Sequence, residues 1–203
     1  LLSPDGETVA HVESPPQSLA PGATVTLDPQ TLTAAPARLW SLTDPALYVV
    51  RCELLDPDSP DGPRVVLDRV DTSYGIRWIS WPQGKDRDRG TFLLNGQPVF
   101  LNGTCEYPHL LGGSHAFSAA QIAARGHQIQ AAGFNAFRDA HHPHDLRYNQ
   151  HWDHDGLAWW TQFGAHIWFD RDDFRANYLA LLRDWVKERR NSPSLVLWGL
   201  QNE

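Results

Sequence analysis

The sequence predicts a chain of two parts: an antiparallel β-sandwich over residues 1–77, and the first half of a (β/α)8 barrel over residues 78–203. In the first part, short alternating apolar stretches are separated by Pro, Gly and Asp turns. In the second part, apolar strands and helical segments alternate four times in roughly 125 residues, half the length of such a barrel. A doubly wound open sheet is the competing topology, but no Gly-rich phosphate loop follows the first strand.

Composition excludes some classes of partner. The 203 residues carry a formal net charge of −7, with the acidic residues scattered along the chain. Nucleic acids and anionic membranes select basic patches, so neither is expected as a primary partner. The chain contains no Met, and we expect it to be a piece of a longer protein, cut at both ends. Bacterial cytoplasm, periplasm and secretion therefore all stay open, as does the oligomeric state.

Three stretches of the first part have the pattern of strands. "ATVTLD" (Ala23–Asp28) alternates, "ALYVVRCELLD" (Ala46–Asp56) is rich in strand formers, and "RVVLDRVDTSYGIR" (Arg64–Arg77) alternates again. Turn signals such as "SPPQ" and "DPDSPDGP" separate them. An all-β domain without chemistry of its own accounts for this part.

The second part begins with a hairpin and a capped helix. Asn95-Gly96 within "FLLNGQPVFLNG" predicts a tight hairpin turn. Ser118 and Gln121 form a capping box that opens a helix, and Gly133 is its expected end. "FNAF" (Phe134–Phe137) then predicts a short buried strand.

Two further helix–strand pairs follow. "PHDLRYNQHWDHDG" predicts a helix and "LAWW" (Leu157–Trp160) a strand. Asp172–Asn191 predicts the clearest helix, because acidic residues begin it and basic residues end it. "SLVLWGL" (residues 194–200) is wholly apolar, as expected of a strand buried on both faces. Three tryptophans are expected in the core: Trp40, Trp78 and Trp185.

Ionisable and polar groups gather where the barrel strands are predicted to end. In a (β/α)8 barrel, functional groups lie at the C-terminal ends of the strands. The predicted ends carry Cys105-Glu106, Arg138-Asp139-Ala140-His141, Thr161-Gln162 and Asn202-Glu203. Packing alone does not explain this concentration, so this edge of the sheet is the predicted site.

Glu203 follows an apolar strand, next to Asn202 and shortly after Trp198. Partial desolvation there would favour the protonated carboxyl that a proton donor requires. A solvated glutamate without a role is the other interpretation, and position alone does not separate the two.

The stretch "RNSPSLVLWGLQNE" resembles the acid/base signature of glycoside hydrolase family 2. The positions that fit the signature are Asn191, Pro193, Ser194, Leu195, Val196, Leu197, Trp198, Gly199, Asn202 and Glu203. Arg189 and Ser192 depart from it in the preceding loop.

The stretch "NAFRDAHHPHDLRYNQHWDHDGLAWW" (Asn135–Trp160) resembles the second signature of the same family. Arg138 and His141 hold their places in it, Asp139 replaces a small residue, and His142 stands where Tyr is usual. Two long motifs in the right order and spacing make the resemblance specific, and it covers nearly the whole chain. It implies an immunoglobulin-like β-sandwich followed by the first half of a (β/α)8 TIM barrel.

The family resemblance implies a retaining exo-β-glycosidase, which needs two carboxylates roughly 5–5.5 Å apart. By that resemblance Glu203 is the general acid/base, and Asn202 binds the sugar 2-hydroxyl. Arg138 is expected against the nucleophile carboxylate, and His141 against the sugar. The nucleophile itself, a Glu after the seventh strand, is expected beyond the end of this chain. A β-galactosidase acting on a β-galactoside or related β-glycoside is the predicted type.

Three more residues are candidates for substrate binding. Glu106 stands, with Tyr107, where relatives carry an Arg-His or His-Glu pair. Asp139 is placed to recognise a hydroxyl, although a helix N-cap explains it nearly as well. Trp168, beyond the third barrel strand, is the best candidate for a platform under a sugar ring.

No metal or other cofactor is expected. The spacings of the histidines in the second motif fit neither a helical HExxH nor a compact tetrahedral set. Some relatives bind Mg²⁺ through an acidic residue and a His after the third strand. Here that region is "TQFGAHIW", with no acid before Asp170, so those ligands are not matched.

Other functions stay open at this point. β-Glucuronidase and β-mannosidase specificities belong to the same family, and the scaffold also suits a non-catalytic carbohydrate-binding or structural module. A metal-dependent hydrolase is the third class. A half barrel leaves sheet edges unpaired and its apolar interior open, so the 203 residues alone are expected to be poorly soluble and inactive.

Overall fold

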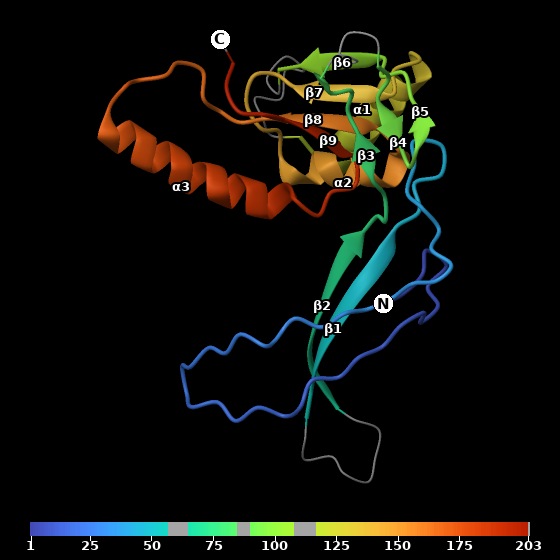
Figure 1. Cartoon of the computed structure of the whole chain (residues 1–203), viewed down its shortest axis with the longest axis vertical. Coiled ribbons are helices and arrows are strands. Elements are labelled where there is room, and N and C mark those ends of the chain that lie inside the picture. The colour runs from blue at the N-terminus through green and yellow to red at the C-terminus, as the bar shows by residue number, and fades with distance from the viewer. Residues whose placement is uncertain (57–64, 85–89, 108–116, 203) are drawn as a thin grey trace. The chain divides into compact units, whose positions relative to one another are not determined.

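The computed structural model of the chain describes residues 1–56, 65–84, 90–107 and 117–202 (Figure 1). The chain divides into two compact units, Leu1–Arg38 with Leu47–Tyr74, and Leu39–Ala46 with Gly75–Glu203. No helix in the described part combines the length and apolarity needed to cross a lipid bilayer.

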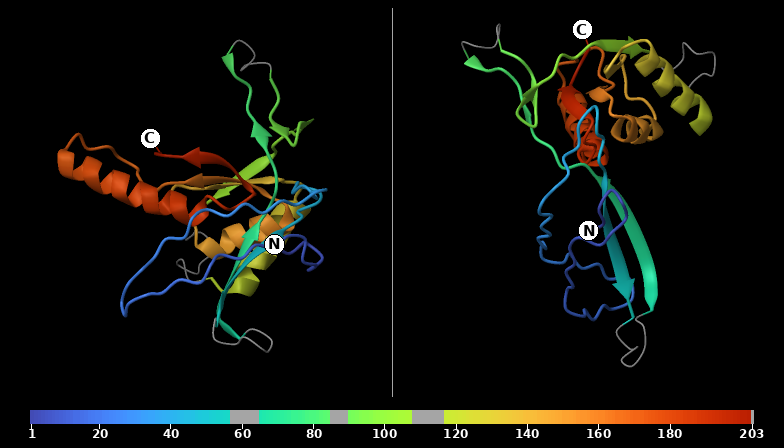
Figure 2. Two further views of the ribbon diagram at one scale, coloured as in Figure 1. Left: turned by 60° about the horizontal axis from the view of Figure 1, so that its bottom comes forward. Right: turned by 90° about the vertical axis from the view of Figure 1, so that its right-hand side faces the viewer.

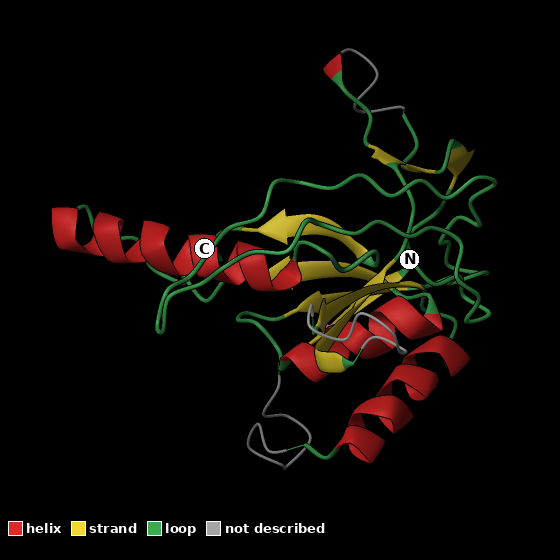
Figure 3. Ribbon diagram, turned by 90° about the horizontal axis from the view of Figure 1, so that it is seen from below, coloured by secondary structure: helices red, strands yellow, loops and turns green. Residues whose placement is uncertain are grey.

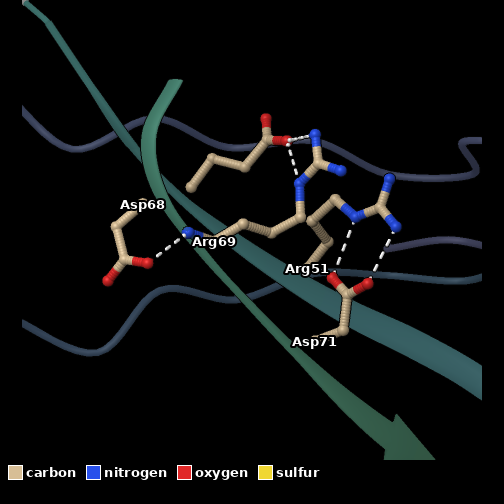
Figure 4. Close-up of polar contacts among 5 residues, drawn as sticks. Arg51, Asp68, Arg69 and Asp71 are labelled. Carbon is tan, nitrogen blue, oxygen red and sulfur yellow. Dashed lines mark hydrogen bonds and ion pairs between the residues drawn. The ribbon is translucent and has the colours of Figure 1, made fainter.

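The described residues of the first unit form one antiparallel pair of strands, β1 (Tyr48–Leu55) and β2 (Val66–Tyr74). Arg51 and Asp71 lie opposite each other in this pair, and the guanidinium donates two hydrogen bonds to the carboxylate, at 2.9 and 2.8 Å (Figure 4). These hydrogen bonds lower the pKa of Asp71. Because both groups are at the surface, the ion pair specifies the register more than it adds stability.

The predicted strand at Ala23–Asp28 is wrong. This stretch is exposed throughout and pairs with no strand among the described residues. Alternation alone does not make a strand, because backbone N–H and C=O groups need a neighbouring strand to pair with. The described part of this unit contains the other two predicted strands without a second sheet, so the immunoglobulin-like sandwich stays a prediction.

The second unit is built on a four-stranded parallel sheet. Its strands, in spatial order, are β6 (Gly103–Glu106), β7 (Ala136–Asp139), β8 (Ala158–Gln162) and β9 (Leu195–Gly199). Helices connect successive strands: α1 (Ala119–Ala131), α2 (Leu146–Asp155) and α3 (Asp172–Arg189). A parallel sheet in sequential order with a helix in each connection fits part of an α/β barrel, as predicted.

Local signals explain where the helices begin. Gln121 N donates to Ser118 Oγ at 3.3 Å and Ser118 N donates to Gln121 Oε1 at 2.8 Å, which is the predicted capping box of α1. Asp145 caps α2 by accepting from Arg147 N at 2.8 Å.

Helices α1 and α2 cover one face of the sheet (Figure 3). The core between them and the sheet is aromatic and aliphatic: Phe117, Ile122, Ile129, Phe137, Tyr148, Trp152, Leu157, Trp159 and Leu195. Only the last two turns of α3 contribute buried residues, Trp185 and Arg189, and its N-terminal half extends away from the sheet (Figure 1; Figure 2).

The opposite face of the sheet is open among the described residues. One row of register partners crosses it, Cys105, Arg138, Trp160 and Leu197. Trp160 is 36% exposed and Leu197 is 37% exposed. Strand β9 is therefore buried on one face only, where burial on both was expected, because the described helices all lie on the other side.

A small antiparallel sheet precedes the barrel strands, with β3 (Ile79–Ser80), β4 (Leu93–Leu94) and β5 (Gln97–Pro98). Its turn at Asn95-Gly96 has φ of 54° and 78°, as the predicted hairpin requires. The tryptophan predictions are confirmed for Trp40 and Trp185, at 0% and 5% exposure, and wrong for Trp78, which is 54% exposed. A sheet of two-residue strands has too little surface to bury an indole ring.

The segment Leu39–Ala46 closes the end of the sheet at which the strands begin. Trp40 Nε1 donates to the backbone carbonyl of Asp153 in α2 at 2.7 Å. Gly156, directly after α2, has φ +73° and approaches Leu42 so closely that a Cβ would lie 2.4 Å from the Leu42 carbonyl oxygen. This contact requires glycine.

Gly156→Ala is expected to lower the free energy of unfolding by at least about 3 kcal/mol, because strain at positive φ adds to a backbone clash. Gly133→Ala is the matched control. Gly133 has φ +86° but open space around it, so only the conformational cost of about 1–2 kcal/mol applies. Urea unfolding of both variants measures the difference, and equal losses would contradict the close approach to Leu42.

Candidate active site

The C-terminal ends of three parallel strands meet at one guanidinium on the open face. Arg138 Nη2, from β7, donates to Gln162 Oε1 at the end of β8 at 3.1 Å. The same nitrogen donates to Asn202 Oδ1, after β9, at 3.0 Å. The guanidinium carbon lies 4.4 Å from the ring centroid of Trp160, a cation–π geometry. The network thus joins two predicted site residues, Arg138 and Asn202, directly, and Gln162 is a second acceptor of the same guanidinium nitrogen.

The amide of Asn202 is held at both ends. Its oxygen accepts from Arg138, and its Nδ2 lies 3.4 Å from His166 Nδ1, which can accept in the appropriate tautomer. Its backbone N–H donates to the carbonyl of Ala165 at 3.0 Å. Asn202 is 9% exposed. The described residues engage one N–H of this amide, so the other can donate to a ligand.

Gly199 allows this network to pack closely. A Cβ at Gly199 would lie 2.5 Å from Gln162 Oε1 and 2.6 Å from Trp160 Nε1. Any larger residue would displace the two side chains that support Arg138. The glycine of the "LWG" stretch is therefore explained by the network beside it.

His141, in the loop after β7, lies near the same cluster. Its ring packs edge-to-face with Tyr107 at 4.9 Å between centroids, and the His166 ring is 6.1 Å away. His141 Nδ1 is buried and has no hydrogen-bond partner among the described residues. Buried polar nitrogens are normally paired, so this nitrogen is available to a hydroxyl-bearing ligand.

Asp139 and Glu106 lie on the helix-covered face, because successive residues of a strand point to opposite faces. Asp139 is 0% exposed, and its carboxylate accepts hydrogen bonds from Trp159, Thr161 and Gln162. A direct contact between Asp139 and a sugar hydroxyl has no support in this geometry, because the side chain is buried on the covered face with its oxygens hydrogen-bonded. It is also no helix N-cap, since Asp145 caps α2.

Glu106 is engaged in an ion pair with helix α1. Arg125 donates from Nε to one Glu106 oxygen at 3.0 Å and pairs through Nη2 with the other. Both carboxylate oxygens are thus occupied. A direct contact between Glu106 and a sugar has no support in this geometry.

Trp168, in the segment before α3, belongs to an aromatic cluster with residues of that helix. Its ring makes edge contacts with Phe174 and Tyr178, at 5.0 and 5.3 Å between centroids, and it is 43% exposed. A cavity of about 550 Å³ lies between α3 and the loop after β8. His166 lines this cavity and also contacts Asn202. The sugar-platform role of Trp168 stays a prediction.

Glu203, the predicted acid/base, lies outside the described residues. It follows Asn202 directly in the sequence.

The described residues contain no group of three or more His, Cys, Asp and Glu side chains that would hold a metal ion. The histidines of the second motif are dispersed. His144 is buried against Asp139, whereas His151 and His154 lie on α2 near Asp155. The loop after β8 carries His166 without an acidic residue before Asp170.

Asp153 anchors the loop that leads into β9, a role that no sequence signal separated from the rest of its motif. Its Oδ1 accepts from Ser192 Oγ at 2.6 Å and from Ser194 N at 3.0 Å. Burial raises the pKa of Asp153 to about 6, and the hydrogen bonds from Ser192 and Ser194 oppose that rise. The start of the strand that leads to Asn202 is therefore tied to α2.

Comparisons with known proteins agree on one family. A family model described as "Glycosyl hydrolases family 2, TIM barrel domain" matches residues 86–203. A β-glucuronidase of Bacteroides fragilis is 29% identical over 212 residues, covering 100% of this chain and 29% of that protein. A β-galactosidase of Alteromonas mediterranea is 28% identical over 182 residues, covering 86% of this chain and 16% of that protein.

Solved structures resemble the chain as well. The apo structure of Bacteroides uniformis β-glucuronidase 3 superposes with a TM-score of 0.78 at 26% identity, covering 100% of this chain and 23% of that one. The chain thus spans less than a third of the length of each of these relatives.

The raised pKa of Asp153 predicts a pH dependence of stability. An unfolded Asp loses its proton near pH 4, whereas the folded carboxyl keeps it to about pH 6. Unfolding therefore releases a proton in this window, and the free energy of unfolding falls as pH rises from 4 to 6, by about 3 kcal/mol at most. Asp153→Asn retains the acceptor oxygen and is expected to abolish this fall.

Urea unfolding at pH 4.5 and pH 7 measures the effect. Asp184→Asn is the control, because that carboxylate is 72% exposed and its substitution should leave the pH dependence unchanged. Equal pH dependence in the wild type and Asp153→Asn would contradict the assignment to Asp153.

Proposed function

Because the chain belongs to glycosyl hydrolase family 2, as its two motifs predict, we propose that it is part of a retaining exo-β-glycosidase acting on terminal β-linked sugars. The observation that carries this proposal is the network of Arg138, Gln162 and Asn202 at the ends of three parallel strands, directly before Glu203. Polar groups at this edge of a barrel sheet are where barrel enzymes place their chemistry.

In the proposed mechanism Glu203 first protonates the glycosidic oxygen and then activates water for the second step. Asn202 donates its remaining amide N–H to the sugar 2-hydroxyl. Arg138 supports this role, because it holds Asn202 Oδ1 at 3.0 Å and so determines which end of the amide faces the sugar. His141, whose buried Nδ1 has no partner among the described residues, binds a further sugar hydroxyl.

A retaining mechanism needs a second carboxylate roughly 5–5.5 Å from the first. Among the described residues, the carboxylates closest in sequence to this edge, Asp139 and Glu106, lie on the covered face with their oxygens occupied. We therefore infer that the nucleophile comes from outside these 203 residues, in the remaining part of a family barrel.

Arg138 is suited to receive that nucleophile. Its hydrogen bonds to Gln162 and Asn202 both come from Nη2, and its Nε is buried without a partner in the described part of the chain. A guanidinium has five N–H donors and pairs well with a carboxylate through two of them. We propose that the free edge of Arg138 orients the nucleophile and keeps it ionised.

The identity of the sugar is a finer proposal. A β-galactoside is the predicted substrate, and relatives named β-galactosidase support it. Relatives named β-glucuronidase support a β-glucuronide equally, and β-mannoside is the third alternative. The same proposal includes an immunoglobulin-like sandwich over residues 1–77 ahead of the barrel, with Trp168 as a sugar platform. A non-catalytic carbohydrate-binding module on the same scaffold is the competing function.

Whole protein that carries this chain is expected to hydrolyse one of three nitrophenyl substrates: the β-galactoside, the β-glucuronide or the β-mannoside. Glu203→Gln should lower turnover of that substrate by about 10²–10⁴-fold, because nitrophenolate leaves without a proton donor but the water of the second step loses its general base. Azide, which needs no general base, should restore part of the rate. Sugar binding without turnover of any substrate would favour the binding module.

Asn202→Ala is expected to lower kcat/KM by about 10–100-fold through loss of the contact with the 2-hydroxyl. The matching 2-deoxy substrate isolates this contact. On that substrate the wild type and Asn202→Ala should differ by less than about threefold, because neither can make the hydrogen bond. An undiminished loss on the 2-deoxy substrate would show that Asn202 acts elsewhere.

A further inference from the structure

Asp139 and Arg138 are neighbours in β7 and hold the same residue of β8 from opposite faces of the sheet. On the open face, Arg138 Nη2 donates to the side-chain oxygen of Gln162 at 3.1 Å. On the covered face, Gln162 donates from its backbone N–H to Asp139 Oδ2 at 3.4 Å. Gln162 is 0% exposed. Gln162, at the end of β8, is therefore held by hydrogen bonds to both its backbone and its side chain.

The Asp139 carboxylate accepts from three donors of β8, and a buried histidine of the loop after β7 lies beside it. Trp159 Nε1 donates to Oδ1 at 3.1 Å and Thr161 Oγ1 donates to Oδ2 at 3.0 Å. His144 Nδ1 lies 3.1 Å from Oδ1, and both side chains are at most 2% exposed. A carboxylate this deeply buried is tolerated only when it is paired and hydrogen-bonded.

This arrangement restricts the position of the β8 end more than packing would. Apolar contacts tolerate sliding of one strand past another, whereas three directional hydrogen bonds to one carboxylate do not. Asp139 bonds to Trp159, Thr161 and Gln162 within one strand. Any shift of β8 relative to β7 must break these bonds.

We propose that Asp139 is a positioning residue of the active site. It fixes Gln162 from the covered face, Gln162 fixes Arg138 on the open face, and Arg138 orients Asn202. The catalytic consequence rests on the proposed function, but the mechanical link from Asp139 to Gln162 does not. A misplacement of catalytic groups by about 1 Å costs on the order of 100-fold in rate.

The test exchanges Asp139 and Thr161, the two partners of the shortest hydrogen bond to Asp139 Oδ2. In the whole protein, Asp139→Thr should lower kcat/KM 10–100-fold, mainly through kcat, and Thr161→Asp alone should lower it at least as much. The double exchange keeps one carboxylate and one hydroxyl at the junction, so it should recover to within about fivefold of wild type. Asp145→Thr, the same substitution at an exposed N-cap position, should leave kcat/KM unchanged.

Hydrogen exchange measured by mass spectrometry reads the same link without relying on activity. Peptides that contain Gln162 should exchange faster in Asp139→Thr and regain protection in the double exchange. If Asp139→Thr does not fold, Asp139→Asn, which replaces one acceptor by a donor, takes its place in both measurements.

Each outcome of these measurements supports or overturns the positioning role of Asp139. Unchanged exchange at Gln162 in Asp139→Thr overturns the proposal, and so does faster exchange with wild-type kcat/KM, or a double variant no better than the single one. If the wild type hydrolyses no glycoside, the proposed function fails. Hydrogen exchange then tests the link between Asp139 and Gln162 by itself. Recovered protection in the double variant supports the link, and unchanged protection in Asp139→Thr contradicts it.

Discussion

The guanidinium of Arg138 is the group on which the site depends. Its two hydrogen bonds, to Gln162 and Asn202, join the ends of three strands that have no other common partner among the described residues. Trp160 supports the flat face of the guanidinium, and Gly199 leaves room for this arrangement. A planar cation with donors in fixed directions can orient an amide in a way that a lysine ammonium cannot.

The two faces of the sheet have different tasks, and strand alternation separates them. The face covered by α1 and α2 carries an aromatic core, with the buried Asp139 and the Glu106–Arg125 pair at its edge. The open face carries Arg138 and the groups that can meet a ligand. Buried structural contacts thus lie on one side of each strand and the candidate site on the other, and side chains on a rigid element can be held to within a fraction of an ångström.

The opposite end of the sheet is secured by buried polar contacts. Asp153 holds the loop before β9 through Ser192 and Ser194, and Arg77 donates to the carbonyls of Pro193 and Leu195, at 2.9 and 2.5 Å. Ionisation of a buried aspartate lowers the free energy of unfolding, so Asp153 makes the fold less stable above pH 6. In return, its hydrogen bonds fix the backbone at the start of β9. The strand that leads to Asn202 and Glu203 is therefore constrained before its first residue.

The sequence by itself determined the family, the order of strands and helices in the second unit and the hairpin at Asn95-Gly96, because periodicity, capping residues and motif spacing are local. It also placed Arg138 and Asn202 at the same edge of the sheet, where the structure shows them joined by a hydrogen bond. It did not determine that Asp139 and Glu106 lie on the covered face, that Ala23–Asp28 forms no strand or that Trp78 is exposed. Those outcomes depend on strand register and on which surfaces other elements cover, and only the tertiary structure decides them.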